Sequence, residues 1–280
     1  MAGDVLTRPA RPPDLVLQYA DRADQVADLC LPAGQRGNGS QSGIPLVIFL
    51  HGGFWRAAYD RTHTGPLAEG LTAAGFAVCA PEYRRTGQRG GGWPGTFDDV
   101  AVAVDALPRL VASATGGLAG LGPVVLAGHS AGGHLALWAA SRCRLPSGTS
   151  WHAEVAVSGV VSLAGVCELA ECFRRRLGGG AARALMGGGP SRYPDRYAAA
   201  DPAALLPSGQ RAWLVHGTAD RNVPVELSKS YAVRAEAASD PVTLTVLPGV
   251  GHFELIDPLS GAWPAVKSAF LASSGLSAAP

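Results

Sequence analysis

The chain has 280 residues, 47% of them hydrophobic and 16% charged, with a formal net charge of +1. Enough apolar residues are present to bury a core, so a disordered chain is excluded, and the length suits one large domain. Nucleic-acid binding, which requires a basic surface, has no support in this charge balance.

The five cysteines are scattered, and no Cys-x-x-Cys pair occurs. Their odd number leaves at least one thiol free, which favours reduced cysteines in a cytoplasmic protein. The N-terminus lacks the apolar centre of a signal peptide, and residues 1–14, rich in Pro and Arg, are predicted to form a flexible leader. No uncharged apolar run reaches the roughly 18 residues that a spanning helix needs. We therefore expect a cytoplasmic protein that does not interact with a membrane.

The predicted elements alternate along the chain. Two opening strands, 15–19 and 26–31, are expected to pair antiparallel. Short continuous apolar runs then predict strands buried on both faces, at 45–50, 76–80, 123–127, 153–158, 211–216 and 242–247. Helical stretches are expected at 62–74, 96–111, 131–142, 224–238 and 263–272. This order predicts the α/β class, with a mostly parallel twisted sheet and helices on both of its faces.

A single domain is expected over residues 15–272. Residues 159–209 depart from the alternation, because glycine runs interrupt their short apolar pieces, and they predict an inserted lid of small helices. The Ser-, Ala- and Pro-rich tail 273–280 is expected to be flexible.

Ser130 stands in a Gly-x-Ser-x-Gly pentapeptide, residues 128–132. The motif alone is weak evidence in a chain with 37 glycines. Its context is stronger, because an apolar strand precedes it and a helical stretch follows it. Glycines at both ends permit a tight strand-to-helix turn that exposes the serine oxygen. We interpret Ser130 as a nucleophile; an ordinary serine in a glycine-rich turn is the alternative.

A His-Gly-Gly-Phe-Trp segment, residues 51–55, follows another predicted strand. Backbone amides of such a turn can stabilise the oxyanion that forms during acyl transfer. We assign the donors to Ala131 and to Gly53 or Phe54; a simple strand-ending turn is the alternative. Phe54 and Trp55 adjoin this turn and are predicted to line an apolar acyl or aryl pocket.

Asp220 and His252 complete the candidate machinery. Asp220 follows the strand predicted at 211–216, and it could orient an imidazole or merely cap the next helix. His252 lies after the last predicted strand and is the only histidine C-terminal to Asp220. The order Ser, Asp, His is that of α/β-hydrolases. These residues and the turn at 51–53 all follow strands, and ligands of such sheets bind at the carboxyl ends of the strands.

The remaining histidines are weaker candidates. His51 is expected to hold the glycine turn through its ring nitrogens. His129 and His134 are expected to brace the strand-to-helix turn at Ser130, which we call the elbow. Neither His-Glu-x-x-His nor paired cysteine spacing occurs, so no metal site is expected.

Taken together, residues 51–55, 128–135, 216–224 and 251–253 resemble the α/β-hydrolase superfamily. Within it they are most similar to the kynurenine formamidase (arylformamidase) and small-carboxylesterase branch, where a His-Gly-Gly-aromatic-Trp turn is typical. The resemblance implies a Ser130–Asp220–His252 triad, no cofactor, water as one substrate, and a small-molecule ester or N-formyl amide as the other. In formamidases an Asp-Leu motif is expected near residues 163–169, where this chain reads Leu-Ala-Gly-Val-Cys-Glu-Leu.

The functional prediction is a serine hydrolase acting through an acyl-enzyme, with N-formyl-L-kynurenine as the expected substrate and L-kynurenine and formate as products. A general carboxylesterase or deacetylase is the first alternative. The second is a hydrolase relative that binds a small molecule without catalysis. A homodimer is one assembly that the sequence leaves open.

Overall fold

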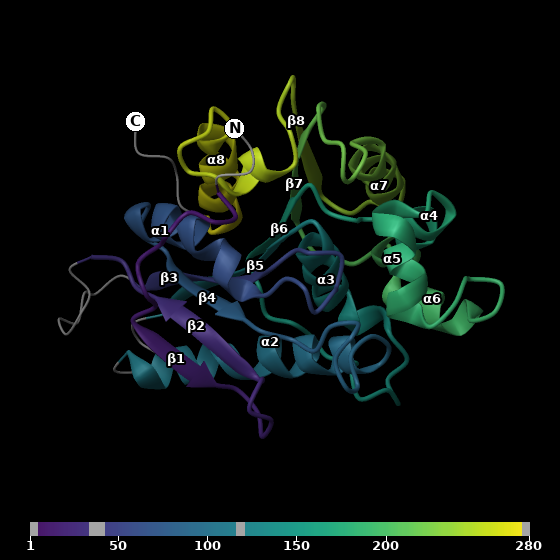
Figure 1. Ribbon diagram of the computed structural model, residues 1–280, viewed down its shortest axis with the longest axis horizontal. Helices are drawn as coiled ribbons and strands as arrows, with labels where there is room; N and C mark the ends of the chain where they lie inside the picture. The colour runs from purple at the N-terminus through teal and green to yellow at the C-terminus, as the bar shows by residue number, and fades with distance from the viewer. Residues whose placement is uncertain (1–4, 34–42, 116–120, 276–280) are drawn as a thin grey trace.

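The computed structural model describes residues 5–33, 43–115 and 121–275, and these contain an eight-stranded sheet with the order β1-β2-β4-β3-β5-β6-β7-β8 (Figure 1). The β1–β2 and β2–β4 pairs are antiparallel, and all the others are parallel. The strands are β1 (Leu15–Gln18), β2 (Val26–Cys30), β3 (Ile44–Leu50), β4 (Ala77–Pro81), β5 (Leu121–His129), β6 (Gly159–Leu163), β7 (Ala212–Gly217) and β8 (Val242–Leu247).

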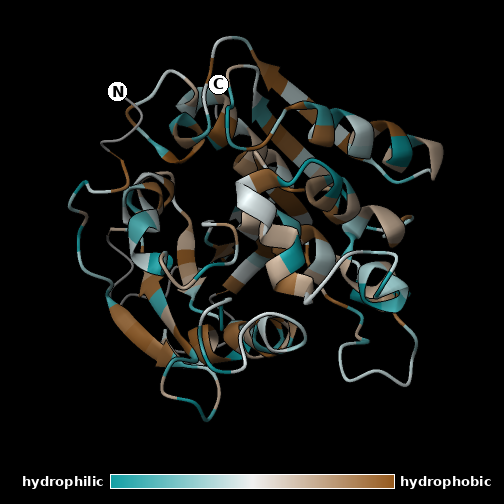
Figure 2. Cartoon of the chain, turned by 45° about the vertical axis from the view of Figure 1, so that its right-hand side comes forward, coloured by the Kyte–Doolittle hydropathy of each residue, from teal (hydrophilic) through white to brown (hydrophobic). Residues whose placement is uncertain are grey.

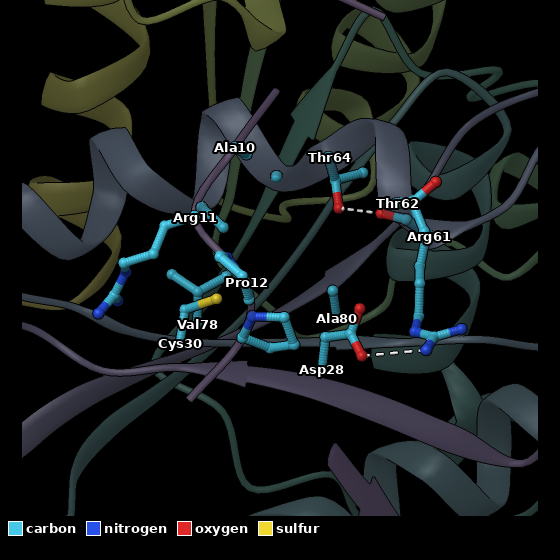
Figure 3. A pocket seen from close by; sticks show the side chains of 13 residues that line it. Ala10, Arg11, Pro12, Asp28, Cys30, Arg61, Thr62, Thr64, Val78 and Ala80 are labelled. Carbon is cyan, nitrogen blue, oxygen red and sulfur yellow. Dashed lines mark hydrogen bonds and ion pairs between the residues drawn. The ribbon is translucent and has the colours of Figure 1, made fainter. Parts of the chain in front are cut away.

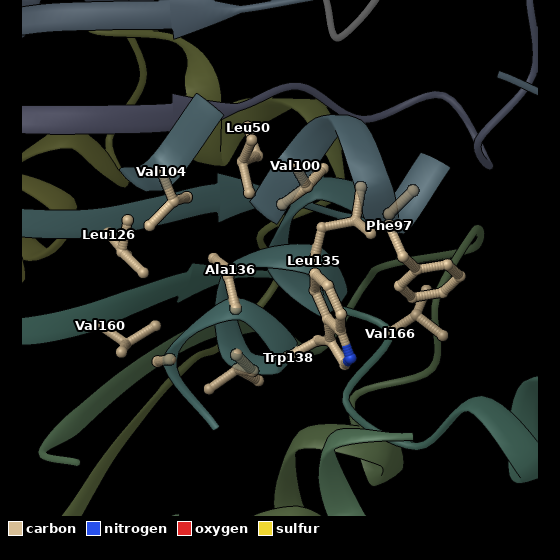
Figure 4. Close-up of a cluster of buried hydrophobic side chains, with 14 of the residues drawn as sticks. Leu50, Phe97, Val100, Val104, Leu126, Leu135, Ala136, Trp138, Val160 and Val166 are labelled. Atoms are coloured by element: carbon tan, nitrogen blue, oxygen red, sulfur yellow. The ribbon is translucent and has the colours of Figure 1, made fainter. Parts of the chain in front are cut away.

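Helices cover both faces of the sheet, as predicted for this α/β class. Along β3, Leu46, Ile48 and Leu50 join one apolar cluster, while Val47 and Phe49 join another on the opposite face. The first cluster includes side chains from α2 (Gly95–Ala114), α3 (Ala131–Ala140) and α7 (Glu226–Ala237), and part of it is drawn in Figure 4. The second includes side chains from α1 (Gly65–Ala73) and α8 (Trp263–Ser273). Figure 2 shows the hydrophobic character of the strands between these layers.

Most predicted elements lie within three residues of the observed ones. The helix expected at 62–74 is divided into a 3-10 turn, η1 (Arg61–Thr64), and α1. Further 3-10 turns are η3 (Arg142–Arg144), η4 (Pro202–Ala204) and η5 (Phe253–Ile256). The chain between β6 and β7 holds three small helices, α4 (Leu169–Arg174), α5 (Leu177–Met186) and α6 (Pro194–Ala200), which lie together at one side of the molecule (Figure 1).

The strand predicted at 153–158 is wrong, and the sixth strand is β6, residues 159–163, which the lid prediction had included. Residues 153–158 alternate between half-buried and exposed, whereas β6 is buried throughout. Gly159 begins this strand, where a side chain would overlap the Trp213 ring on β7. The crowded central strand therefore requires a glycine at a position that the predicted lid had included.

Residues 5–14, part of the predicted leader, make contacts with the domain. Val5 is 1% exposed in the cluster that holds α1 and α8. The Arg8 guanidinium donates two hydrogen bonds to Asp257, at 2.6 and 2.9 Å. Residues 1–4 of the leader and 276–280 of the tail lie outside the described residues. The contacts of the described leader residues thus include apolar packing and a bidentate ion pair, which composition alone does not reveal.

Candidate active site

Ser130 occupies a sharp turn between the end of β5 and the start of α3. Its φ of 57° and ψ of −118° are uncommon for a residue with a side chain. A Cβ on Gly128 would overlap the Gly132 carbonyl, and one on Gly132 would overlap the Leu50 carbonyl. Both glycines of the motif are therefore required, because helix and strand backbones touch here.

His252 and Asp220 are joined by a short hydrogen bond. His252 Nδ1 lies 2.6 Å from Asp220 Oδ2, and the Asp220 side chain is fully buried. Asp220 Oδ1 also accepts hydrogen bonds from the amides of Asn222 and Val223, at 2.8 and 2.9 Å. The residue before α7 is Val225, so Asp220 does not cap that helix. The carboxylate is placed to keep the Nδ1–H tautomer of His252, which leaves Nε2 free to accept a proton.

The charge of Asp220 is stabilised inside the protein. Burial alone would raise the pKa of this carboxyl group, but hydrogen bonds from His216 and His252 hold it well below its ordinary value. His216 Nε2 is 3.3 Å from Asp220 Oδ2, and His216 Nδ1 is 2.7 Å from Ser228 Oγ. Asp220 therefore stays ionised at neutral pH. His216 was not among the site residues predicted from the sequence; its position at the end of β7, four residues before Asp220, was the available signal.

The loops after β3, β5 and β8 meet at Ser130. His129, the residue before it, contacts the His252 ring, with centroids 4.4 Å apart. On the other side, a Cβ on Gly52 would lie 3.2 Å from Ser130 Cβ. These contacts bring the three predicted triad residues and the glycine turn to one edge of the sheet, where the parallel strands end.

The glycine turn has an unusual backbone: Gly53, Phe54 and Trp55 all have positive φ, at 104°, 50° and 55°. Ala131 begins α3, so its amide has no acceptor within the helix. The amides that we assign as oxyanion donors thus belong to two segments that both lie beside Ser130. Tyr59, which was not predicted from the sequence, packs so closely on Gly53 that a Cβ on Gly53 would overlap the Tyr59 side chain. Tyr59 itself is 46% exposed.

Of the two residues predicted to line the pocket, one is not at its surface. Trp55 is fully buried in the core, where its ring lies 5.2 Å from that of His134. Phe54 is half-buried and packs against Gly178 of the β6–β7 segment. Because Trp55 has no exposed surface, it does not line a pocket in this structure, and the pocket prediction for Trp55 is wrong.

His51 holds the turn as expected. Its Nδ1 donates to the Gly52 carbonyl at 2.8 Å, and its Nε2 lies 2.9 Å from Glu82 Oε1. Tyr83 stacks on the ring, with centroids 4.3 Å apart, and donates to the His51 carbonyl at 2.7 Å. Burial would raise the pKa of Glu82, but the His51 hydrogen bond lowers it below its usual range. A buried polar network thereby fixes the backbone that carries the amides predicted to be oxyanion donors.

A cavity of about 270 Å³ is lined by residues 10–13 together with residues of β2, η1 and β4 (Figure 3), and its lining includes neither the predicted triad nor the glycine turn. Its wall includes Arg61, which donates to Asp28 at 3.0 Å and lies 3.7 Å from Glu82. The cavity is thus connected through Glu82 to the polar network that holds the glycine turn, but it does not include the candidate nucleophile.

Among the described residues, no cluster of three or more His, Cys, Asp or Glu side chains is arranged to hold a metal ion. No helix in the described ranges is long and apolar enough to cross a membrane.

Comparison with known proteins finds one family model, and the similar proteins include esterases and a kynurenine formamidase. The BD-FAE family model matches residues 28–234. Esterase LipC of Mycobacterium tuberculosis is 28% identical over 226 residues, which cover 76% of this chain and 54% of LipC. Kynurenine formamidase of Danio rerio is 30% identical over 118 residues, covering 42% of this chain and 35% of that protein. The chain therefore spans only about half or less of the curated relatives it matches. A truncated carbohydrate esterase from gut microbiota has a similar fold, with a TM-score of 0.76 and 20% identity over 95% of this chain and 100% of its own.

The contact between α3 and β3 predicts that replacing glycine by alanine costs much more stability at position 132 than at an open position. Gly132→Ala should destabilise the protein by about 3 kcal/mol or more, because the new methyl group meets backbone that cannot move aside. Gly148→Ala is the matched control, since a Cβ there has open space, and it should change stability by less than about 0.5 kcal/mol. Urea unfolding of both variants measures the difference; equal midpoints would contradict the close contact.

The lowered pKa of Asp220 predicts a pH-dependent contribution to stability. The carboxylate stabilises the fold above its unfolded-state pKa of about 4, and this contribution is lost as the pH falls through the lower folded-state pKa. Asp220→Asn should therefore cost on the order of 1–3 kcal/mol at pH 7, and the difference from wild type should shrink below pH 4. Unfolding free energies of both proteins between pH 3 and 7 test this. A difference independent of pH would show that Asp220 is not the stabilised anion.

Proposed function

Since the chain belongs to the BD-FAE family of α/β-hydrolase esterases, we propose that it is a serine hydrolase that cleaves small esters through an acyl-enzyme on Ser130. The observation that carries the proposal is the 2.6 Å bond between His252 and the buried Asp220, beside a serine with φ of 57°. A hydroxyl becomes nucleophilic when an oriented imidazole removes its proton. This arrangement supplies the oriented imidazole.

The proposed reaction has two steps. His252 accepts the Ser130 proton as the oxygen attacks the substrate carbonyl, and the ionised Asp220 stabilises the resulting imidazolium. The amides of Ala131 and of Gly53 or Phe54 stabilise the oxyanion, and each such donor contributes on the order of 3 kcal/mol to the barrier reduction. The leaving alcohol or amine departs with the proton from His252. Water, activated by the same histidine, then releases the acid.

The surroundings favour a substrate with an apolar or aromatic part. Tyr59 lies on the oxyanion turn, and Phe253 packs edge-on against His252, with ring centroids 5.0 Å apart. Phe54 closes the side next to the β6–β7 segment. Aromatic side chains around the site suit an uncharged ester better than an anionic substrate.

An arylformamidase is the second candidate. The match to the Danio rerio kynurenine formamidase and the His-Gly-Gly-Phe-Trp turn favour it. N-formyl-L-kynurenine offers an aromatic ring and a formyl group that needs little space beside Ser130. Its charged amino-acid group, however, needs polar partners at the mouth of the site.

The proposal predicts the effect of removing the nucleophile. Ser130→Ala should lower kcat on p-nitrophenyl butyrate by a factor on the order of 10⁵ to 10⁶ without destabilising the fold. A fluorophosphonate probe should label the wild type and leave the variant unlabelled, as mass spectrometry of the intact protein would show. Near wild-type turnover by purified Ser130→Ala protein would refute the assignment.

A substrate comparison separates the two candidates. If the protein is an esterase, kcat/KM for short p-nitrophenyl esters should exceed that for N-formyl-L-kynurenine by about 100-fold or more, since specificity is the difference in transition-state binding. A ratio that favours N-formyl-L-kynurenine would establish the formamidase instead. Ser130→Ala serves as the blank for both substrates, so that spontaneous hydrolysis is subtracted.

A further inference from the structure

We infer that His129 is a positioning residue, which holds His252 at a fixed place relative to Ser130 and the oxyanion turn. The inference rests on the proposed serine-hydrolase function and extends it to a side chain outside the triad. His129 is 1% exposed, so it has no access to solvent. Its role must therefore act through the residues that it touches.

The first contact is with the His252 loop. His129 Nε2 lies 3.0 Å from the backbone carbonyl oxygen of His252. Because a carbonyl only accepts, this bond places a hydrogen on Nε2 of His129 and leaves Nδ1 without one. The two rings also touch, with centroids 4.4 Å apart and an interplanar angle of 48°. One side chain thus restrains both the backbone and the ring of the proposed base.

The second contact is with the glycine turn. A Cβ on Gly52 would lie 3.1 Å from His129 Nδ1, so the imidazole fills the space directly beside this glycine. Among the described residues Nδ1 has no hydrogen-bond partner, which makes this contact one of packing. His129 therefore separates the turn that carries the oxyanion donors from the loop that carries the base. Since it is also the chain neighbour of Ser130, it sets the relative positions of all three.

His129 is uncharged, as its position beside the proposed base His252 requires. Burial and the neighbouring His252 hold the pKa of His129 well below its ordinary value, so the ring stays neutral. His63, which also acts on His129, has its pKa lowered to about 4 by burial. Asp220 is then the charged group that faces His252 when His252 takes the proton from Ser130. A second cation at 4.4 Å would oppose that transfer.

The test separates the hydrogen bond from the volume of the ring. His129→Phe keeps an aromatic ring but removes the donor, and it should lower kcat on p-nitrophenyl butyrate about 10- to 100-fold with little change in KM, as expected for a displaced catalytic group. His129→Gln can return an amide N–H near the position of Nε2 and should recover much of the lost kcat. Rates are expressed per active site titrated with a fluorophosphonate, so that a loss of folded protein does not imitate a loss of kcat.

His152→Phe is the matched control. His152 also donates from its ring to a backbone carbonyl, that of Leu145 at 2.8 Å, but it lies in the loop between η3 and β6, which holds none of the candidate triad residues. This variant should retain the wild-type kcat. It measures what the loss of one such hydrogen bond costs when the base is not involved.

A pH profile gives a readout that a purely structural role would not change. His129→Asp places a carboxylate beside the imidazole and favours its protonated form, so the acid limb of the kcat/KM profile should move to higher pH by about one unit. If His129→Phe turns over like the wild type, if His129→Gln is as slow as His129→Phe, or if the limb in His129→Asp does not move, the inference is overturned. Failure of the wild type to hydrolyse esters or react with the probe would instead overturn the proposed function.

Discussion

The site depends on a contact between two backbones. The first turn of α3 packs on the end of β3 so closely that only glycine fits at position 132, and Gly128 closes the same turn from the β5 side. This proximity forces Ser130 into a conformation that costs on the order of 1–3 kcal/mol. Every residue of α3 is buried, so the helix cannot withdraw to relieve that strain. The core therefore holds the candidate nucleophile, itself only 2% exposed, at the start of α3, whose first amides lack acceptors within the helix.

The second constraint is a charge that the fold buries and must stabilise. An unpaired carboxylate at the fully buried position of Asp220 would be strongly unfavourable. Two histidines and two backbone amides satisfy it, and Ser228 in turn binds the far side of His216. Because these partners come from β7, the following loop and α7, the network orients Asp220 from several directions. The direction of its bond to His252 is thus set by secondary structure, not by a mobile side chain.

The sequence predicted the fold class and the chain order of the site because both depend on local signals. Continuous apolar runs mark strands that helices cover on both sides, and the BD-FAE match confirms the resemblance to α/β-hydrolases. The errors arose where a distant residue decides the local structure. Gly159 belongs to β6 because Trp213 leaves no room for a side chain, and Trp55 turns into the core toward His134. Such contacts between residues far apart in the chain leave no periodic pattern.

In the proposed hydrolase, the candidate catalytic residues and the side of the site next to Phe54 lie on different segments. The candidate catalytic residues lie on loops at the ends of parallel strands, whose positions the sheet register determines. The side of the site next to Phe54 is instead closed by the β6–β7 segment, where Gly178–Gly180 have positive φ and Gly178 packs on the Phe54 ring. Arg56 donates to the Gly178 carbonyl and anchors this segment to the oxyanion turn. The same segment is also joined to the turn at Ser130, because the Val166 amide donates to the Ser130 carbonyl at 3.2 Å and His134 Nε2 lies 2.9 Å from the Ala200 carbonyl oxygen. A change in this segment would therefore act on the turn at Ser130 as well as on the lining beside Phe54. Family membership accordingly indicates the reaction more directly than the compound on which it is performed.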